Sequence, residues 1–208
     1  MALESPLTKS GVIPDVLKSA PSPDLNLRVS YENETLKMGA NIARQETTME
    51  TPTLTINAAG GNDRFNHFTI IMTDPDLFVK NDPTGQVRHW LQTGLTRQSD
   101  GSLAATTPAV TPYLPCAPGP GPAHRYVFIL CDEGTRQDVA KKAREEFPSK
   151  SDTHDLKDRM GFNAQEFIDK YGLTIVGVTF MEVSPTARSL VDNLQLGAQS
   201  LYHKVVGT

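Results

Sequence analysis

Four side chains in this sequence have the chemistry to form a small polar site. Asp74 and Asp76 end one short apolar run, and His89 lies in the next apolar segment. His124 begins a later apolar run. Carboxylates and imidazoles that lie close together can bind an anion, ligate a metal ion or act as general acid and base. Which of these they do depends on the elements that position them.

The segments around Asp74 and His89 have the composition of β-strands. β-Branched and aromatic residues dominate residues 68–72, and Pro75 prevents that segment from continuing as a central strand. We therefore expect a buried strand that carries two carboxylates to the end of a sheet, and a returning strand that carries an imidazole nearby. The same residues also fit an Asx-Pro turn that Asp74 merely caps. Taken alone, the stretch favours the turn, because Asp-Pro turns are common.

The second histidine lies on a strongly apolar strand, residues 124–130, with His124, Tyr126 and Phe128 on one face. A single strand histidine is usually a core residue whose ring is satisfied by hydrogen bonds. Two such histidines beside an aspartate-rich turn weaken that interpretation without removing it. We expect His154 and His203 to be solvated.

The rest of the chain adds more strands than helices. Further strands are predicted at residues 25–31, 53–56, 66–73, 87–91 and 173–183, and helices at residues 12–19, 138–147 and 163–171. Residues 96–122 have the composition of a loop. From residue 186 onward, apolar residues recur at helical spacing, which predicts an amphipathic C-terminal helix. The pattern predicts one mainly β domain over residues 1–208.

Composition narrows the class of protein. The chain has 208 residues, 38% of them hydrophobic and 21% charged, and a net charge of -4, as in an ordinary soluble globular protein. Its basic residues are scattered, which argues against a nucleic-acid partner. We expect no transmembrane segment, no signal peptide and a cytoplasmic location. Cys116 and Cys131 fit free thiols better than a disulfide, although one bridge stays open. Nothing indicates a cofactor or a metal site.

Two blocks of sequence carry a resemblance. The first is Met72-Thr73-Asp74-Pro75-Asp76 followed by Arg88-His89-Trp90-Leu91, and the second is residues 121–128, Gly-Pro-Ala-His-Arg-Tyr-Val-Phe. In this order they resemble the two signature blocks of the phosphatidylethanolamine-binding proteins, which include the Raf kinase inhibitor protein, plant flowering-time regulators and the yeast carboxypeptidase Y inhibitor. The resemblance extends over about residues 11–183 and leaves residues 184–208 as a C-terminal helical extension.

The resemblance implies a large central antiparallel sheet, a smaller flanking sheet and peripheral helices. It also implies an anion pocket at one end of the central sheet. The residues that match the pocket of the family are Asp74, His89, Pro118, His124 and Tyr126. Imidazoles and a phenol can donate hydrogen bonds to a phosphate, and an aspartate can orient one imidazole and keep it protonated.

The chain departs from the family around these residues. Leu77 and Phe78 follow the Asp-Pro-Asp turn where a proline is usual, Val87 replaces an aromatic residue, and Cys116 stands in a loop that usually reads Gly-Pro-Pro. Arg88 introduces a guanidinium beside His89, but strand alternation should direct it away from that ring.

The resemblance implies a non-enzymatic protein that binds a phosphate-bearing small ligand or a phospholipid head group. Such a protein would regulate or inhibit a partner, either a serine carboxypeptidase or a signalling kinase. In that family's yeast branch the N-terminal segment contacts the protease, and residues 1–24 are long enough for a similar role. Two alternatives remain: a small hydrolase using Asp74, His89 and His124, and a simple lipid carrier.

Overall fold

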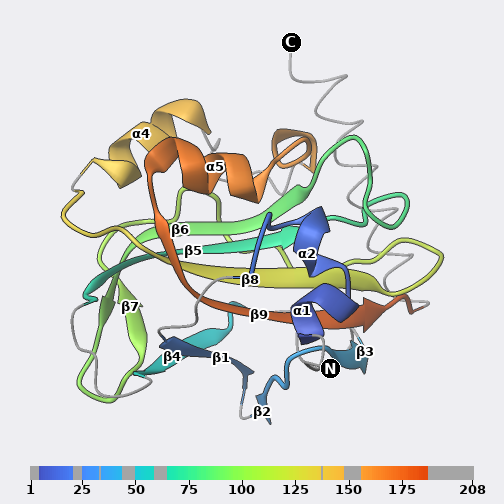
Figure 1. The fold of residues 1–208 in the computed structure, drawn as a ribbon, viewed down its shortest axis with the longest axis horizontal. Coiled ribbons are helices and arrows are strands. Elements are labelled where there is room, and N and C mark those ends of the chain that lie inside the picture. Colours follow the sequence, from blue (N-terminus) through green and yellow to red (C-terminus); the bar gives the residue numbers. More distant parts are fainter. Residues whose placement is uncertain are drawn as a thin grey trace.

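The fold is built from two β-sheets, with short helices against one of them (Figure 1). The computed structural model describes residues 5–20, 25–32, 34–43, 50–58, 65–136, 138–147 and 156–186. In spatial order, the six-stranded sheet consists of β3 (Ala40–Ala43), β9 (Thr174–Ser184), β8 (His124–Asp132), β5 (His67–Asp74), β6 (Val87–Arg97) and β7 (Leu103–Ala105). The smaller sheet contains β2 (Glu34–Thr35), β1 (Leu25–Tyr31) and β4 (Thr53–Ala58). This arrangement confirms the predicted fold class.

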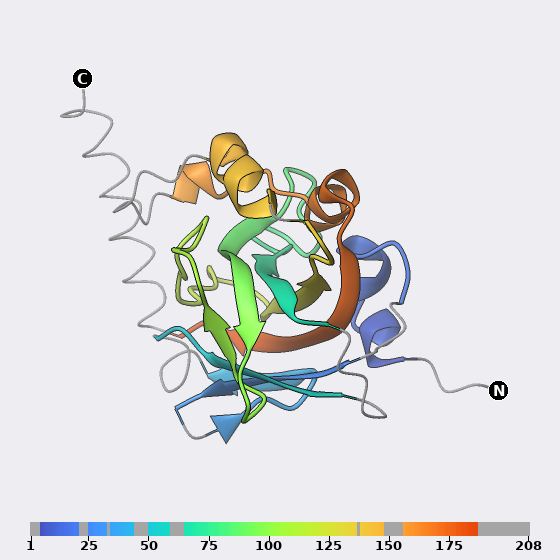
Figure 2. The same ribbon diagram turned by 90° about the vertical axis from the view of Figure 1, so that its left-hand side faces the viewer.

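Every neighbouring pair in the large sheet is antiparallel except β3 and β9, which pair in parallel. The helices are α1 (Pro6–Lys9), α2 (Val12–Asp15), α4 (Val139–Glu146) and α5 (Ala164–Tyr171), with a 3-10 turn at Leu156–Asp158. Figures 1 and 2 show the helices on one side of the large sheet and the small sheet on the other. No helix within the described residues is long and apolar enough to cross a bilayer.

Both faces of the central strands are therefore covered, and this explains why their sequences are almost continuously apolar. Side chains alternate between two cores along β8: Tyr126 and Phe128 pack toward the small sheet, while Val127 and Ile129 pack toward the helices. On β1, the alternating apolar residues Leu25, Leu27, Val29 and Tyr31 are all buried, as their spacing predicted. Cys116 and Cys131 are free thiols in different cores.

Local sequence signals failed at three places. The helix expected at residues 12–19 ends at Asp15, and Ile13 inside it has extended backbone angles, as a residue that precedes proline prefers. The expected loop at residues 96–122 contains β7, which pairs with the end of β6. The sequence analysis also missed β2 and β3, which are short and lie at sheet edges.

The predicted C-terminal helix falls mostly outside the described residues, which end at residue 186. Ser184, where that extension was expected to begin, is the last residue of β9. His154 and His203 also lie outside the described part of the chain.

A buried ion-pair network ties the Asp-Pro-Asp turn to the N-terminal segment. Arg125 donates from Nε to Asp76 Oδ2 at 2.9 Å and from a terminal nitrogen to Asp76 Oδ1 at 2.7 Å. Its other terminal nitrogen reaches Asp15 Oδ2 at 2.7 Å and the Ser10 carbonyl at 3.0 Å. Burial disfavours the charged form of Asp76, but hydrogen bonds from Arg125 and Asn81 outweigh it and lower its pKa. The second carboxylate of the turn is thus a structural anchor.

Removing the Asp76 carboxylate should lower the stability of the protein. An Asp76→Asn variant leaves the Arg125 guanidinium buried without its carboxylate partner and should lower the free energy of unfolding by about 3–5 kcal/mol. The matched control is Lys18→Ala, which breaks an ion pair with Asp169 whose side chains are 73% and 50% exposed. That loss should stay below about 1 kcal/mol. Urea unfolding followed by circular dichroism measures both, and equal losses would contradict the anchoring role.

Candidate functional site

Sheet pairing brings Asp74 and His124 together. β5 pairs antiparallel with β8, and Thr73 opposite Val127 is the last pair before the turn. Because antiparallel strands run in opposite directions, the end of β5 meets the beginning of β8. His124 Nδ1 lies 2.9 Å from Asp74 Oδ2, and both side chains are almost fully buried. Two residues far apart in the sequence thus form one ion pair at one end of the sheet.

The two oxygens of Asp74 have separate roles. Oδ1 accepts a hydrogen bond from the backbone N–H of Asp76 at 2.7 Å, which is the capped turn that the local sequence favoured. Oδ2 contacts His124. One carboxylate therefore caps the turn and also holds an imidazole, that of His124 on β8.

The surroundings of His124 favour its protonated form. Burial alone would lower its pKa, but the hydrogen bond to Asp74 and the negative charges of Asp74 and Asp76 outweigh burial and raise the pKa above its ordinary value. With Nδ1 engaged by Asp74, the protonated ring has Nε2–H left to donate. This imidazolium is a charged donor suited to an anion.

His89 has the opposite character. Its Nδ1 lies 2.9 Å from the carbonyl oxygen of Leu114 and must donate to it, and its ring meets Tyr126 edge-on at 5.0 Å. Burial lowers the pKa of His89 to about 4, although the Asp74 charge and the Leu114 carbonyl oppose this shift, and the nearby Arg159 and His124 charges lower it further. At neutral pH the ring is uncharged, and its free Nε2 accepts hydrogen bonds.

This finding changes one expectation, because the sequence suggested that both imidazoles would donate to a bound anion. Only His124 has surroundings that favour the protonated ring, in which Nε2–H is a donor. His89 instead offers a lone pair, which suits a ligand that carries its own proton, such as a protonated phosphate oxygen or an ammonium group.

Tyr126 and Pro118 complete the predicted set. The side chain of Tyr126 is fully buried, 5.0 Å from the His89 ring and 6.5 Å from the His124 ring. Burial, the charge of Asp74 and a hydrogen bond to it raise the pKa of Tyr126 well above the usual value, so the phenol stays protonated. Pro118 is buried in the loop that precedes β8. All five predicted residues therefore lie on elements that meet at one end of the central sheet.

Arg88 lies on the other face of β6, as strand alternation predicted. Its guanidinium stacks over the Phe147 ring at 4.2 Å and donates to Thr111 Oγ1 at 2.6 Å and to the Asp158 carbonyl at 2.9 Å. Burial lowers its pKa to about 10, so it remains a cation at neutral pH. The Arg88 guanidinium therefore contacts the helical side of the protein and does not contribute to the candidate site.

The sequence analysis missed Arg159, which positions His89 from behind. One terminal nitrogen of Arg159 donates to the carbonyls of Pro112 at 2.8 Å and His89 at 3.0 Å. It thereby ties β6 to the loop whose Leu114 carbonyl orients the His89 ring. Arg159 lies in a polar stretch without hydrophobic periodicity. Its role in positioning His89 is visible only from its hydrogen bonds to residues far away in the sequence.

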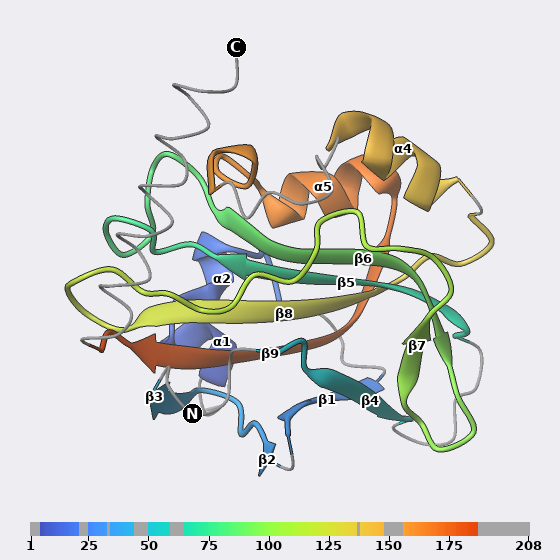
Figure 3. The ribbon, with the colours of Figure 1, turned by 180° about the vertical axis from the view of Figure 1, so that it is seen from behind.

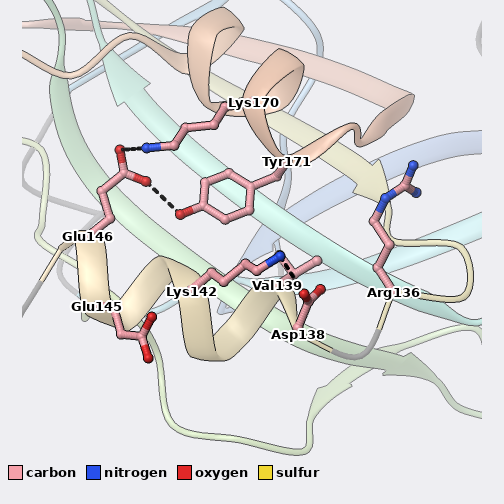
Figure 4. Close-up of a pocket in the computed structure, with 8 residues that line it drawn as sticks. All are labelled: Arg136, Asp138, Val139, Lys142, Glu145, Glu146, Lys170 and Tyr171. Carbon is pink, nitrogen blue, oxygen red and sulfur yellow. Dashed lines mark hydrogen bonds and ion pairs between the residues drawn. The ribbon is translucent and has the colours of Figure 1, made fainter.

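A cavity of about 510 Å³ lies elsewhere, between α4 and the end of α5. Figure 4 shows Lys170 and Tyr171 pointing toward Glu146 across it, with contacts of 2.6 and 2.5 Å. It lies toward the end of the sheet where Asp132 pairs with Thr174, whereas His124 pairs with Val183 at the other end. The cavity is therefore separate from the candidate site.

Comparison with known proteins identifies the family of the chain. Residues 29–180 match the family model described as phosphatidylethanolamine-binding protein. The chain belongs to the phosphatidylethanolamine-binding protein family. "Protein BROTHER of FT and TFL 1" of Arabidopsis thaliana is 31% identical over 145 residues, which cover 68% of this chain and 77% of the relative. "Protein FLOWERING LOCUS T" from the same organism is 28% identical over 175 residues, covering 82% and 85% respectively.

Solved structures of family members share the fold. A carboxypeptidase Y inhibitor, crystallised with its cognate proteinase, superposes with a TM-score of 0.68 at 21% identity and covers 87% of this chain and 94% of its own. A phosphatidylethanolamine-binding protein from Plasmodium vivax gives a TM-score of 0.62 at 17% identity, covering 87% and 96%. At these identities the likeness establishes the fold alone.

His89 and His124 should show different pKa values in a pH titration followed by NMR of the ring nitrogens. His124 should titrate above the ordinary histidine pKa of about 6.5 and His89 below it. As pH falls below about 6.5, unfolded His89 binds a proton while folded His89 does not, so the stability contributed by neutral His89 is lost toward pH 4. Two rings that titrate together near 6.5 would contradict the assignment.

Proposed function

We propose that this family member is a non-enzymatic protein that binds a phosphate-bearing small ligand or a phospholipid head group at Asp74, His89, Pro118, His124 and Tyr126. The observation that supports this most is the ion pair between His124 and Asp74. It supplies a cationic donor that a buried carboxylate keeps protonated, next to an uncharged acceptor on His89. A phosphate with an attached ammonium group matches both.

The geometry gives each part of such a ligand a partner. A phosphate oxygen takes the Nε2–H of His124 as a charge-assisted hydrogen bond. The ammonium group of ethanolamine, or a P–OH group, donates to Nε2 of His89. His124 is 5% exposed and His89 4%, so a ligand contacts only the edges of their rings. A small head group suits such a site better than a bulky substrate.

The lack of a free nucleophile among the five site residues supports a non-enzymatic role. Both oxygens of Asp74 already accept hydrogen bonds, so this carboxylate is not free to attack a substrate. Cys116 is fully buried in the core that the two sheets share. The set therefore lacks an activated nucleophile of the kind a hydrolase needs.

We further propose that the protein regulates a partner, either a serine carboxypeptidase or a signalling kinase. The support is membership of a family with named inhibitors and regulators. Residues 5–20 pack on the body through Val12, Val16 and Leu17, which are at most 2% exposed. Within this stretch, contact with a protease would use the exposed side chains, such as Thr8 and Lys9.

Titration with phosphorylethanolamine tests the ligand. Ring resonances of His89 and His124 should shift on titration, while those of His154 should not. A His124→Ala variant loses the charged donor and should bind roughly tenfold to a hundredfold more weakly, since such a hydrogen bond contributes about 1.5–3 kcal/mol. The matched control, His67→Ala, removes an exposed ring at the opposite end of β5 and should bind normally. The absence of any shift in both site histidines would refute the proposed ligand class.

Inhibition assays test the partner. The protein should inhibit a serine carboxypeptidase or a mitogen-pathway kinase at micromolar concentration or below. A Thr8→Glu/Lys9→Glu variant changes only exposed side chains and should weaken protease inhibition without altering stability. Lack of effect on both enzyme classes would contradict the regulatory role while leaving head-group binding intact.

A further inference from the structure

The loop that follows Asp74 presents two large apolar side chains to solvent. Phe78 is 69% exposed and Val79 is 56% exposed, and within the described residues only Met38, at 44%, is another exposed large hydrophobic side chain. Scattered single apolar residues on a surface need no explanation, but an adjacent pair beside a candidate ligand site does.

Hydrogen bonds within the loop fix the backbone around Phe78 and Val79. Asp76 Oδ1 accepts from the backbone N–H of Asn81 at 2.7 Å, and Asp82 Oδ2 accepts from that of Phe78 at 3.0 Å. The N–H of Asp82 in turn donates to the Pro75 carbonyl at 2.7 Å. Two buried carboxylates thus hold the backbone on both sides of the pair. The loop is organised to hold these side chains outward.

The pair lies beside the candidate site. Residues 75–86 leave the sheet directly after Asp74, and residues 111–123 lead directly into His124. Both loops lie at the same end of the central sheet (Figures 1 and 3). They approach each other closely, because a Cβ placed on Gly119 would lie 4.0 Å from the Leu77 carbonyl oxygen. We call these two loops, residues 75–86 and 111–123, the rim.

The charge of the rim indicates what it contacts. Residues 111–123 contain no charged residue, and Asp76 and Asp82 in the other loop are buried. Lys80, next to Val79, is the only exposed charged side chain of the rim. Most exposed residues of the rim are apolar residues, prolines or glycine, Asn81 and Thr84 are polar, and Lys80 is the one cation, a composition that matches an interface that offers phosphates above hydrocarbon.

We propose that the rim docks on a phospholipid bilayer, with Phe78 and Val79 inserted among the head groups and Lys80 beside the lipid phosphates. This inference rests on the proposed function, because the candidate site would then take the head group of a lipid that stays in the membrane. It also gives the site a means of selecting membrane-bound over free ligand. The rim residue Phe78, which departs from the family pattern, thereby acquires a role.

Vesicle co-sedimentation tests the inference. The probe is vesicles of phosphatidylcholine and phosphatidylethanolamine, and the intact protein should sediment with them. A Phe78→Ser/Val79→Ser variant should partition at least about tenfold more weakly, because each buried apolar side chain contributes more than one factor of ten. The control, Met38→Ser, changes an exposed apolar residue before β3, at the edge of the central sheet away from β5 and β6, and should partition like the intact protein.

A fluorescence measurement gives an independent readout. The single native tryptophan, Trp90, is 6% exposed and provides a constant background. Phe78→Trp should show a blue shift of emission when vesicles are added, because the indole leaves water, and Met38→Trp should show none.

Parallel titration with free phosphorylethanolamine separates this inference from the proposed function. Normal binding of the free head group by the Phe78→Ser/Val79→Ser variant, together with lost sedimentation, supports the inference. Binding of the free head group without sedimentation of the intact protein overturns it and points to a protein partner for the rim. Sedimentation unchanged by the double substitution also overturns it. Failure to bind the free head group is a failure of the proposed function instead.

Discussion

The candidate site depends on the pairing of Asp76 with Arg125. Along β8, alternate side chains face opposite sides of the sheet, so Arg125 points toward the helices while its neighbours His124 and Tyr126 point toward the site. The Arg125 side chain donates two hydrogen bonds to Asp76, its backbone N–H donates a third, and its remaining terminal nitrogen donates to Asp15. The ion pair thereby fixes the turn after β5 against the beginning of β8. Asp74 can meet His124 at 2.9 Å because this anchor lies directly behind it.

The two carboxylates of the turn, Asp74 and Asp76, have different roles. Asp76 has a structural role, because both of its oxygens accept hydrogen bonds from Arg125 or from the backbone N–H of Asn81. Asp74 keeps one oxygen for His124, and this contact raises the pKa of the imidazole although both side chains are almost fully buried. His89, held by a carbonyl instead of a carboxylate, stays neutral in similar burial. Burial lowers the pKa of both rings, and only at His124 does a direct carboxylate partner outweigh burial, so one ring favours the donor form and the other the acceptor form.

Much of this could be predicted from the sequence, and the exceptions have physical causes. The alternating pattern at Leu25–Tyr31 and the capping signal at Asn163, whose side chain accepts from the Glu166 N–H, depend on neighbours in sequence and were confirmed. The resemblance assigned Asp74 and His124 to one candidate pocket, and the structure brings these two side chains into contact. The charge states of His89 and His124 could not be predicted, because they depend on the Leu114 carbonyl, on Arg159 and on burial. The role of Arg159 likewise arises from contacts with residues far away in the chain.

The measurement that tests the central claim most directly is a crystal structure of the protein with bound phosphorylethanolamine. The account predicts a phosphate oxygen within about 3 Å of His124 Nε2, the distance of a charge-assisted hydrogen bond. It also predicts that the ligand's own donor faces His89, with the Asp74–His124 pair unbroken. A ligand bound only in the cavity between α4 and α5, or a site between Asp74, His89 and Tyr126 that remains empty at saturating ligand, would contradict it.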